Sequence, residues 1–299
     1  MSVLLEAVEG GSLSAAGRRL GMPLATVSRK VSDLEAHLKT RLLNRSTRQI
    51  TLTDAGRSYF AACKRILEDV EEAERMAAGE YTAPKGDLIV TAPVVFGRRH
   101  VLPVVIDFLK AYPEIDIRLV LADRVMHLAE DRIDLAVRIG ALPDSAMIAA
   151  RLGAIRRVVC ASPAYLAARG TPAAPDDLRS HDCITFEGLA SQDVWAFAAG
   201  KFQLTIPIHS RLAVNTAEAA IDAAVAGVGI TRVLSYQAAP ALEAGLLSIA
   251  LQDFEPPPWP VSLVYAGQGR LPLKLRAFLD FAAPRLSAAI KQTSRAFVS

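Results

Sequence analysis

The sequence predicts an α + α/β protein, in which a small helical domain and a long helix precede a larger α/β domain. Three observations predict this order. Residues 11–38 have the pattern of two short helices joined by a tight turn, residues 57–78 contain neither Gly nor Pro, and strand-like runs alternate with helical ones after residue 87. The 299 residues, 52% of them hydrophobic, are enough for two domains.

The segment GSLSAAGRRLGMPLATVSRKVSDLEAHL has the spacing of a helix-turn-helix. Gly17 lies where the two helices cross, because only a very small residue lets their backbones approach closely. Gly21 follows in the turn, where a positive φ is needed, and Pro23 opens the second helix. Helical spacing gives each helix one apolar face, formed by Leu13, Ala16 and Leu20 in the first and by Val27, Val31, Leu34 and Leu38 in the second.

The opposite face of the second helix is small, polar and basic. Small side chains allow close approach to base edges, while hydroxyls and arginine supply hydrogen bonds to bases or phosphates. A helix-turn-helix places such a helix in the major groove of DNA. An ordinary amphipathic helix pair is the alternative interpretation. The DNA contacts predicted on this helix are Pro23, Ala25, Thr26, Ser28, Arg29 and Ser32.

Residues 40–53 (TRLLNRSTRQITLT) predict a short hairpin, or wing, beside the second helix. Its tip would carry Arg45, Thr47 and Arg48 within reach of phosphate or a narrow minor groove; a solvated loop is the alternative. Residues 1–57 contain nine Lys and Arg against five Asp and Glu, a net charge of +4, while the whole chain has +3. The basic excess therefore lies at the N-terminal end, and its modest size indicates that specific affinity needs a dimer.

The segment without Gly and Pro predicts one long helix. Thr53 suits the N-cap, and Asp54 suits the positive helix end. Apolar residues then recur at alternating intervals of four and three, as in the a and d positions of a coiled coil, so we expect this helix to pair with a copy of itself. Packing against the chain's own core is the alternative. The seam consists of Tyr59, Cys63, Ile66, Val70, Ala73 and Ala77.

Residues 2–78 resemble the N-terminal domain of the LysR family of bacterial transcriptional regulators. The matching stretches are GSLSAAGRRLGM, ATVSRKVSDLEAHLKTRLLNRSTR and LTDAG, and a looser similarity runs from GDLIVTAP to the end of the chain. The resemblance implies a winged helix-turn-helix that binds double-stranded DNA. It also implies a homodimer that assembles into a homotetramer, and contact with RNA polymerase.

Three features depart from the family pattern. Gly17 stands where Ala is common, and Leu43 stands where Phe is common. Family members also carry one or two further helical turns before the stretch that matches VLLEAVEGGS. We therefore expect Met1 to lie downstream of the natural start, or the chain to be shortened, either of which would weaken the first helix.

Breaker-rich residues 79–86 form the predicted hinge, and residues 87–299 the predicted α/β domain. Strands are expected at 88–92, 115–121, 135–138 and 157–161 and helices at 99–112 and 125–131, an order that implies a parallel sheet. A second series follows, with strands at 184–186, 195–198, 203–207, 212–214, 229–233 and 261–265 and helices at 216–226 and 273–286.

Two crossings of the chain, near Ser162 and Ala266, divide this domain into a lobe I of residues 87–162 and 267–299 and a lobe II of residues 163–266. Two α/β lobes joined by two crossings resemble the periplasmic-binding-protein-like effector domain of the LysR family. The predicted organisation is therefore a DNA-binding domain at 1–56, a dimerisation helix at 57–78, the hinge, and a two-lobed effector domain.

The resemblance places a small organic effector in the cleft between the lobes, where strands end and helices begin. At a helix N-terminus, free N–H groups favour an anionic group. Arg138 could bind a carboxylate or pair with a neighbouring Asp, and Thr216 suits an N-cap with or without a ligand. Many aliphatic and few strongly polar residues favour a partly apolar effector. The predicted contacts are Pro93, Val94, Phe96, Arg138, Ile139, Gly140, Asn215, Thr216, Thr231 and Arg232.

Several other classes of protein are disfavoured. No apolar stretch approaches the ~20 residues of a membrane span, and the N-terminus lacks a secretory signal, so we expect a cytoplasmic protein that joins the nucleoid when bound to DNA. The three Cys and five His show no metal-ligand spacing. No P-loop, serine elbow or paired catalytic carboxylates are present, which predicts no cofactor, metal or enzymatic activity. A redox role for Cys160 and Cys183 is disfavoured, because apolar surroundings make thiols inert.

Three functions are compatible with this organisation: a ligand-responsive transcription regulator, a solute-binding receptor and an enzyme. The receptor leaves residues 2–78 unexplained and lacks a signal peptide, and the enzyme lacks a catalytic constellation. We therefore predict a regulator whose paired recognition helices enter successive major grooves. Effector closure of the cleft would change the spacing of the DNA-binding domains in the oligomer.

Overall fold

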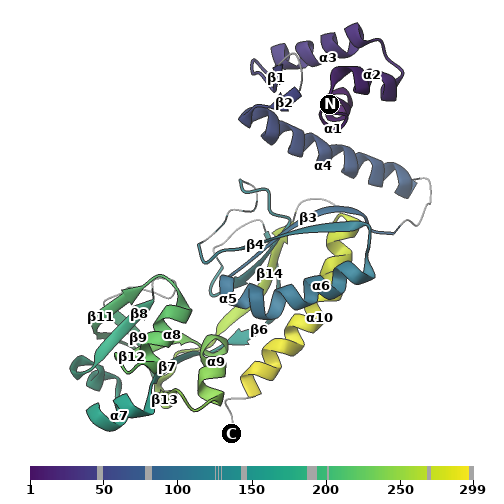
Figure 1. Ribbon diagram of the computed structural model, residues 1–299. Coiled ribbons are helices and arrows are strands. Elements are labelled where there is room, and N and C mark those ends of the chain that lie inside the picture. The colour runs from purple at the N-terminus through teal and green to yellow at the C-terminus, as the bar shows by residue number, and fades with distance from the viewer. Residues whose placement is uncertain are drawn as a thin grey trace. The chain divides into compact units, whose positions relative to one another are not determined.

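The computed structural model describes residues 1–45, 50–77, 83–124, 126, 128, 130–142, 147–186, 194–200, 202–267 and 271–295. The chain forms two compact units, Met1–Ala83 and Pro84–Ser299, which are described separately (Figure 1). Among the described helices, none combines the length and the apolar character that a membrane span requires.

The first unit contains the predicted helix pair, hairpin and long helix. Its elements are α1 (Ser2–Glu9), α2 (Leu13–Leu20), α3 (Leu24–His37), β1 (Leu43–Arg45), β2 (Ile50–Leu52) and α4 (Asp54–Ala77). The Ser12 side chain caps α2 by accepting a hydrogen bond from the Ala15 amide at 3.1 Å. Gly21 ends α2 with a φ of 62°, as the turn was predicted to require. A Cβ on Gly17 would lie 2.8 Å from the Met22 carbonyl oxygen, which explains the need for glycine at the crossing.

The start of α4 lies against the core of this unit. Buried Leu4, Val31, Leu42 and Leu43 form that core. The approach is so close that a Cβ on Gly56 would lie 1.9 Å from the Leu42 carbonyl oxygen. The Thr53 hydroxyl accepts a hydrogen bond from the Gly56 amide at 2.9 Å and donates one to the Arg41 carbonyl at 2.7 Å. These bonds fix the beginning of the long helix to the base of the hairpin.

The predicted seam of α4 divides into two parts. Cys63 is buried, and Tyr59 packs against the core of its own unit. Ile66 and Val70 are 49% and 45% exposed, which is unusual for large apolar side chains. The alternative interpretation is therefore correct for the first two turns of α4, and the following turns present an unpartnered apolar stripe. The side chains of Ala73 and Ala77 lie outside the described residues.

The second unit contains two five-stranded sheets. Lobe I has the strand order β4-β3-β5-β14-β6 and lobe II the order β11-β8-β12-β7-β13. Lobe I consists of β3 (Gly86–Ala92), α5 (Val94–Phe96), the π-helix η1 (Gly97–Val101), α6 (Leu102–Ala111), β4 (Ile115–Leu121), β5 (Leu135–Ile139), β6 (Met147–Ile155), β14 (Trp259–Ala266) and α10 (Leu273–Arg295). Helices α6 and α10 lie side by side against its sheet (Figure 1), with Phe108 and Phe278 in contact.

Lobe II adds a two-stranded sheet to its main sheet. Its elements are β7 (Arg157–Ala161), α7 (Pro163–Arg169), the 3-10 helix η2 (Pro175–Ser180), β8 (Asp182–Phe186), β9 (Val194–Ala199), β10 (Phe202–Pro207), β11 (His209–Val214), α8 (Ala217–Val225), β12 (Ile230–Leu234), α9 (Ser235–Glu243), β13 (Ser248–Ala250) and the 3-10 helix η3 (Gln252–Phe254). One continuous hydrophobic core includes residues of both lobes, such as Leu88, Phe108, Ile184 and Val233.

The structure corrects the predicted sheets and lobe boundaries. Both sheets are mixed, not parallel, because β14 runs antiparallel to β5 and β6, and β7 runs antiparallel to β12 and β13. The first crossing is at Arg156, not near Ser162, since β6 ends at Ile155 and β7 already belongs to lobe II. The return precedes Trp259, not Ala266, because β14 pairs with both β5 and β6 of lobe I.

The predicted helix at 125–131 is also wrong for its described residues. Met126 and Leu128 are buried without belonging to a helix and pack with Ile133, Ala136 and Val264. The predicted helix at 99–112 begins earlier, as α5 and η1 followed by α6.

Candidate functional site

The predicted recognition face of α3 is accessible to solvent. Val27 and Val31 are buried, while Arg29 on the opposite side is exposed. Helical periodicity separates the two faces, so the residues that hold α3 in place differ from those that are free to bind. Of the predicted contacts, Pro23, Ala25 and Arg29 are exposed and Thr26, Ser28 and Ser32 are half-buried.

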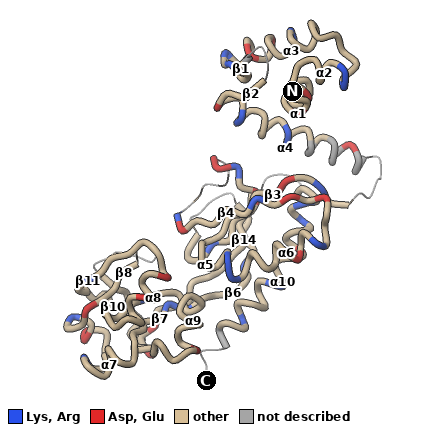
Figure 2. The backbone as a smooth tube through the Cα atoms, viewed as in Figure 1, with Lys and Arg blue, Asp and Glu red and all other residues tan. Residues whose placement is uncertain are grey.

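Several basic side chains have no partner among the residues of this unit that the structure describes. Arg19 lies 3.4 Å from Glu6, and Arg57 donates to the Leu52 carbonyl. In the described part of the unit, no ion pair or hydrogen bond engages the side chains of Arg18, Arg29, Lys30, Lys39 and Arg41. Lys and Arg occur at the end of α2 and at β1 in Figure 2. Lys and Arg side chains that have no such partner are available to neutralise DNA phosphates.

The hairpin has the form expected of a wing. Leu43 pairs with Leu52 and Arg45 with Ile50, so β1 and β2 form an antiparallel hairpin. The side chain of Arg45 and the whole of Thr47 and Arg48 lie outside the described residues, so their contact with DNA stays a prediction.

Glu35 joins the recognition helix to the wing, and sequence reasoning missed it. One carboxylate oxygen, Oε1, accepts hydrogen bonds from the amides of Leu42 and Leu43 at 2.8 and 3.0 Å. A hollow of about 510 Å³ lies between α3 and the hairpin, lined by Ser32, Glu35, Arg41, Leu43 and Asn44. A lone Glu on a helix looks like a solvated residue in sequence, and only the folded hairpin reveals the amides that donate to it.

In the second unit, two of the predicted effector residues are inaccessible. Phe96 has no exposed surface and contacts His100 and Tyr236. Thr231 is also fully buried, and its hydroxyl donates to the Ile184 carbonyl at 3.1 Å. Phe96 therefore packs between the lobes and Thr231 stabilises the sheet of lobe II, and neither side chain offers a surface to a ligand.

Among the other predicted effector residues, Pro93 and Thr216 are helix N-caps, the latter as its alternative interpretation allowed. Pro93 precedes α5, and the Val94 amide donates to Asp123 at 3.0 Å. Thr216 caps α8 by accepting from the Ala219 amide at 3.3 Å. Asn215 is exposed and Ile139 is half-buried.

Arg138 lies near the end of β5, and Gly140 follows the last residue of that strand. Arg138 is half-buried and donates to the Met126 carbonyl, and burial lowers its pKa. Gly140 has a φ of 109°, its amide donates to the Pro260 carbonyl at 2.9 Å, and a Cβ there would lie 3.8 Å from the Trp259 ring. Gly140 is thus needed for its backbone conformation beside the return crossing.

Arg232 lies on the face of the lobe II sheet that β9 covers. Only 5% of its surface is exposed. Its guanidinium donates to the Ala196 carbonyl at 3.0 Å and lies 5.0 Å from the centre of the Trp195 ring. Burial, and then the charge of Arg157, lower the pKa of Arg232 to about 10.

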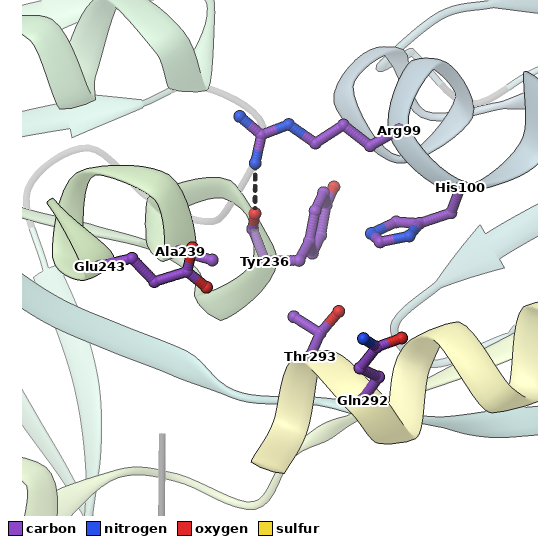
Figure 3. Close-up of a pocket in the computed structure, with 7 residues that line it drawn as sticks. All are labelled: Arg99, His100, Tyr236, Ala239, Glu243, Gln292 and Thr293. Atoms are coloured by element: carbon purple, nitrogen blue, oxygen red, sulfur yellow. Dashed lines mark hydrogen bonds between the residues drawn. The ribbon is translucent and has the colours of Figure 1, made fainter. Parts of the chain in front are cut away.

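Two pockets flank a set of contacts between the lobes. Arg99 of η1 donates to the Tyr236 carbonyl of α9 at 2.8 Å, and Arg98 lies 3.6 Å from Glu218 of α8. One pocket, of about 260 Å³, is shown in Figure 3 and is lined by Arg99, His100, Tyr236, Ala239, Glu243, Gln292 and Thr293. The other, of about 290 Å³, is lined by Arg99, Glu218, Ile221, Asp222, Val225, Gln237, Pro240, Ala241 and Leu246.

None of the ten predicted effector residues lines these two pockets, and sequence reasoning missed Arg98, Arg99 and His100. The sequence did carry a signal for them. Basic residues near the start of a helix interact unfavourably with the helix dipole, so their presence there indicates a role other than stabilising that helix. The π-helix itself is a second signal, visible only in the structure, since such segments are frequent at functional sites.

The two cysteines of lobe II are buried and free. Burial raises the pKa of both the Cys160 and the Cys183 thiol to about 12. A protonated, inaccessible thiol is a poor nucleophile.

Family models match both units of the chain. The model described as bacterial regulatory helix-turn-helix protein, lysR family, matches residues 1–57. The model described as LysR substrate binding domain matches residues 82–287.

Similar proteins cover almost the whole chain. An HTH-type transcriptional regulator of Xanthomonas campestris pv. campestris is 35% identical over 289 residues, which cover 95% of this chain and 84% of that protein. The structure of CrgA, a LysR-type transcriptional regulator from Neisseria meningitidis, is 32% identical with a TM-score of 0.61, covering 95% of this chain and 97% of that one. The full-length structure of the Vibrio cholerae virulence activator AphB is 27% identical with a TM-score of 0.61, covering 94% and 96%.

Proposed function

The chain belongs to the LysR family of transcriptional regulators, and we propose that it recognises its operator with the exposed face of α3. It is a DNA-binding regulator controlled by a small-molecule effector. In the proposal, Thr26, Ser28 and Arg29 contact bases or phosphates in the major groove, with Pro23, Ala25 and Ser32 at the edges of the same surface. Arg45, Thr47 and Arg48 of the wing contact the DNA backbone or the minor groove.

One observation carries this proposal: the exposed and unpartnered guanidinium of Arg29, on the side of α3 opposite buried Val27 and Val31. An arginine that makes no ion pair or hydrogen bond among the described residues of its unit is available for the two acceptors of a guanine. Lys30, Lys39 and Arg41 supply nearby positive charge for phosphates.

The test is fluorescence anisotropy of the full chain with duplex DNA from upstream of its own gene, at several salt concentrations. Arg29→Ala should weaken binding to this duplex roughly tenfold or more while changing binding to a scrambled duplex little. Arg45→Ala should weaken binding to both duplexes alike and reduce the salt slope by about 1. Arg118→Ala, which changes an exposed arginine of β4 in the second unit, is the matched control. Equal binding by the wild type and both variants would contradict the assignment.

We further propose that α4 forms a homodimer through Ile66 and Val70, and that dimers assemble into a homotetramer. The exposed apolar stripe supports the dimer, since large apolar side chains at a/d spacing favour burial against a second helix. Ile66→Glu should shift the sedimentation coefficient of the full chain toward that of a smaller species. Ser58→Glu, at an exposed position of the same helix, should not. An unchanged oligomer in Ile66→Glu would refute the assignment of this stripe.

For the effector, we propose a site between the lobes that includes Pro93, Val94, Gly140, Asn215, Thr216 and Arg232, with Arg138 and Ile139 supporting its wall. A ligand that contacts both lobes favours the conformation that brings them together. A coupling of about 1–3 kcal/mol between effector and DNA is enough for regulation. We also propose that the protein acts in the cytoplasm, contacts RNA polymerase and catalyses no reaction.

A further inference from the structure

Two arginines of lobe II are neighbours in its sheet. In the antiparallel pair of β7 and β12, Arg157 pairs with Leu234 and Arg232 pairs with Val159. Arg157 and Arg232 are therefore diagonal neighbours on one face, a relation that brings long side chains within reach of each other. Among the residues that the structure describes, no carboxylate pairs with either guanidinium.

Both guanidiniums contact aromatic rings, and both are at least partly buried. Arg232 is 5% exposed, against the Trp195 ring. Arg157 is half-buried, 4.6 Å from the centre of the Trp259 ring, and donates to the Pro257 carbonyl at 3.3 Å. The Nε of Arg157 is the one buried side-chain nitrogen or oxygen in the described residues that has no hydrogen-bond partner.

This arrangement is unfavourable unless an anion completes it. A buried charge costs free energy unless it is paired, and two like charges nearby increase that cost. Each arginine has five N–H donors, and the protein engages one donor of each. Several donors of both side chains therefore remain for one oxyanion, which arginine binds with matched geometry.

The arginine pair lies where the chain passes between the lobes. Arg157 follows the first crossing directly, and Trp259 begins the strand that follows the return. Trp259 in turn lies beside Gly140 of lobe I. A ligand bound to the two arginines is thus adjacent to residues of both lobes.

We propose that Arg157 and Arg232 bind the anionic group of the effector, which makes the effector an organic anion with a carboxylate or phosphate group. This inference rests on the proposed function, since it names the chemistry of the effector site. Binding pairs two otherwise uncompensated charges at the crossing between the lobes. The anion therefore stabilises one relative arrangement of the lobes, which is the property that an effector needs.

The test uses the full chain and four sodium salts at constant pH and ionic strength: acetate, benzoate, phosphate and, as reference, chloride. The chain has two Trp, and each contacts one of the two arginines, so intrinsic fluorescence reports directly on the site. Thermal unfolding provides a second readout, because a ligand of the native state raises the Tm. The variants are Arg157→Met and Arg232→Met, with Arg118→Met as the matched control.

We expect at least one oxyanion to give a saturable fluorescence change and a Tm increase that chloride does not give. Arg118→Met should respond like the wild type, and both site variants should bind at least tenfold more weakly. A stronger response to acetate or benzoate identifies a carboxylate, and a stronger response to phosphate identifies a phosphate. If Arg232→Met does not fold, the response of Arg157→Met to the oxyanions decides whether the inference holds, because Arg157 is half-exposed.

Two results would overturn the inference: oxyanions that act like chloride on the wild type, or site variants that respond like the wild type. DNA binding of the same samples separates this failure from failure of the proposed function. Sequence-specific DNA binding without an oxyanion response rejects only the anion site. Absence of sequence-specific DNA binding by the wild type rejects the regulator mechanism itself.

Discussion

The two units of this protein place their functional residues in opposite ways. In the first unit, the proposed DNA contacts on α3 fall within ten consecutive residues, and the same helix buries Val27 and Val31. In the second unit, Arg157 and Arg232 come from separate strands and meet only because β12 lies between β8 and β7. A surface made by one helix follows from local periodicity, whereas a site made by strand pairing depends on topology.

The largest effect expected from a single substitution concerns the packing of the first unit. Gly56→Ala should destabilise this unit by about 3 kcal/mol or more and abolish DNA binding, because its Cβ would meet the Leu42 backbone at 1.9 Å. Gly11→Ala, with a φ of 69° and open space around it, should cost only about 1 kcal/mol. Denaturant unfolding followed by circular dichroism checks both. Equal losses in the two variants would show that close approach at Gly56 is unimportant.

The next largest loss of stability is expected where the chain of the second unit crosses between lobes I and II. Arg156 at the first crossing binds Glu255 before the return through two hydrogen bonds of 2.7 Å. The two side chains are only 19% and 11% exposed, so Glu255→Leu alone should cost about 3 kcal/mol by removing the carboxylate that accepts two hydrogen bonds from a largely buried guanidinium. The double variant Arg156→Met/Glu255→Leu should recover much of this loss. If the double variant loses as much unfolding free energy as the two single variants lose together, the two residues do not act as one ion pair.

A smaller effect is expected where the recognition helix meets the wing. Glu35→Ala removes the acceptor of two amides belonging to buried residues and should cost about 2 kcal/mol. DNA affinity should fall by about fivefold or more, because the wing loses its fixed position relative to α3. Glu35→Gln keeps an acceptor oxygen and should retain most of both properties. Unchanged DNA affinity in Glu35→Ala would separate the wing from recognition.

The smallest effect is a pH dependence between the lobes. Burial, and then the charge of Arg99, lower the pKa of His100 below its usual value of 6.5. The unfolded chain then binds more protons than the native state as pH falls below about 6.5, so stability is full above this pH and declines below it. His100→Gln should reduce the decline in Tm between pH 7 and pH 5. His181, whose pKa burial also lowers, acts in the same direction and should account for the remainder in its own Gln variant.

The sequence predicts the first unit well, because each of its elements carries a local signal. Gly21 marks the turn by its positive φ, and Ser12 marks a helix start by its cap. Glu35 escaped prediction, since the amides of Leu42 and Leu43 that donate to it become neighbours only when the hairpin folds back onto α3.

In the second unit, periodicity predicts most strands but not their partners. Strand β6 was missed because MIAARLGAI combines small residues with exposed positions, and it lacks the apolar alternation of a core strand. Without β6, the first crossing could not be located at Arg156. Arg232 was predicted as a contact from its place at a strand end, but the partner Arg157 follows only from the antiparallel pairing of β7 with β12.

Every functional role proposed for this chain depends on recognition of a DNA sequence by the exposed face of α3. The most direct measurement is selection of bound duplexes from a randomised pool by the full chain and by Arg29→Ala, followed by sequencing. We predict an inverted repeat for the wild type, with half-sites one helical turn or a multiple apart, and loss of preference at one base pair in each half-site for Arg29→Ala. No enriched motif with the wild type, or an identical motif with the variant, would contradict this prediction.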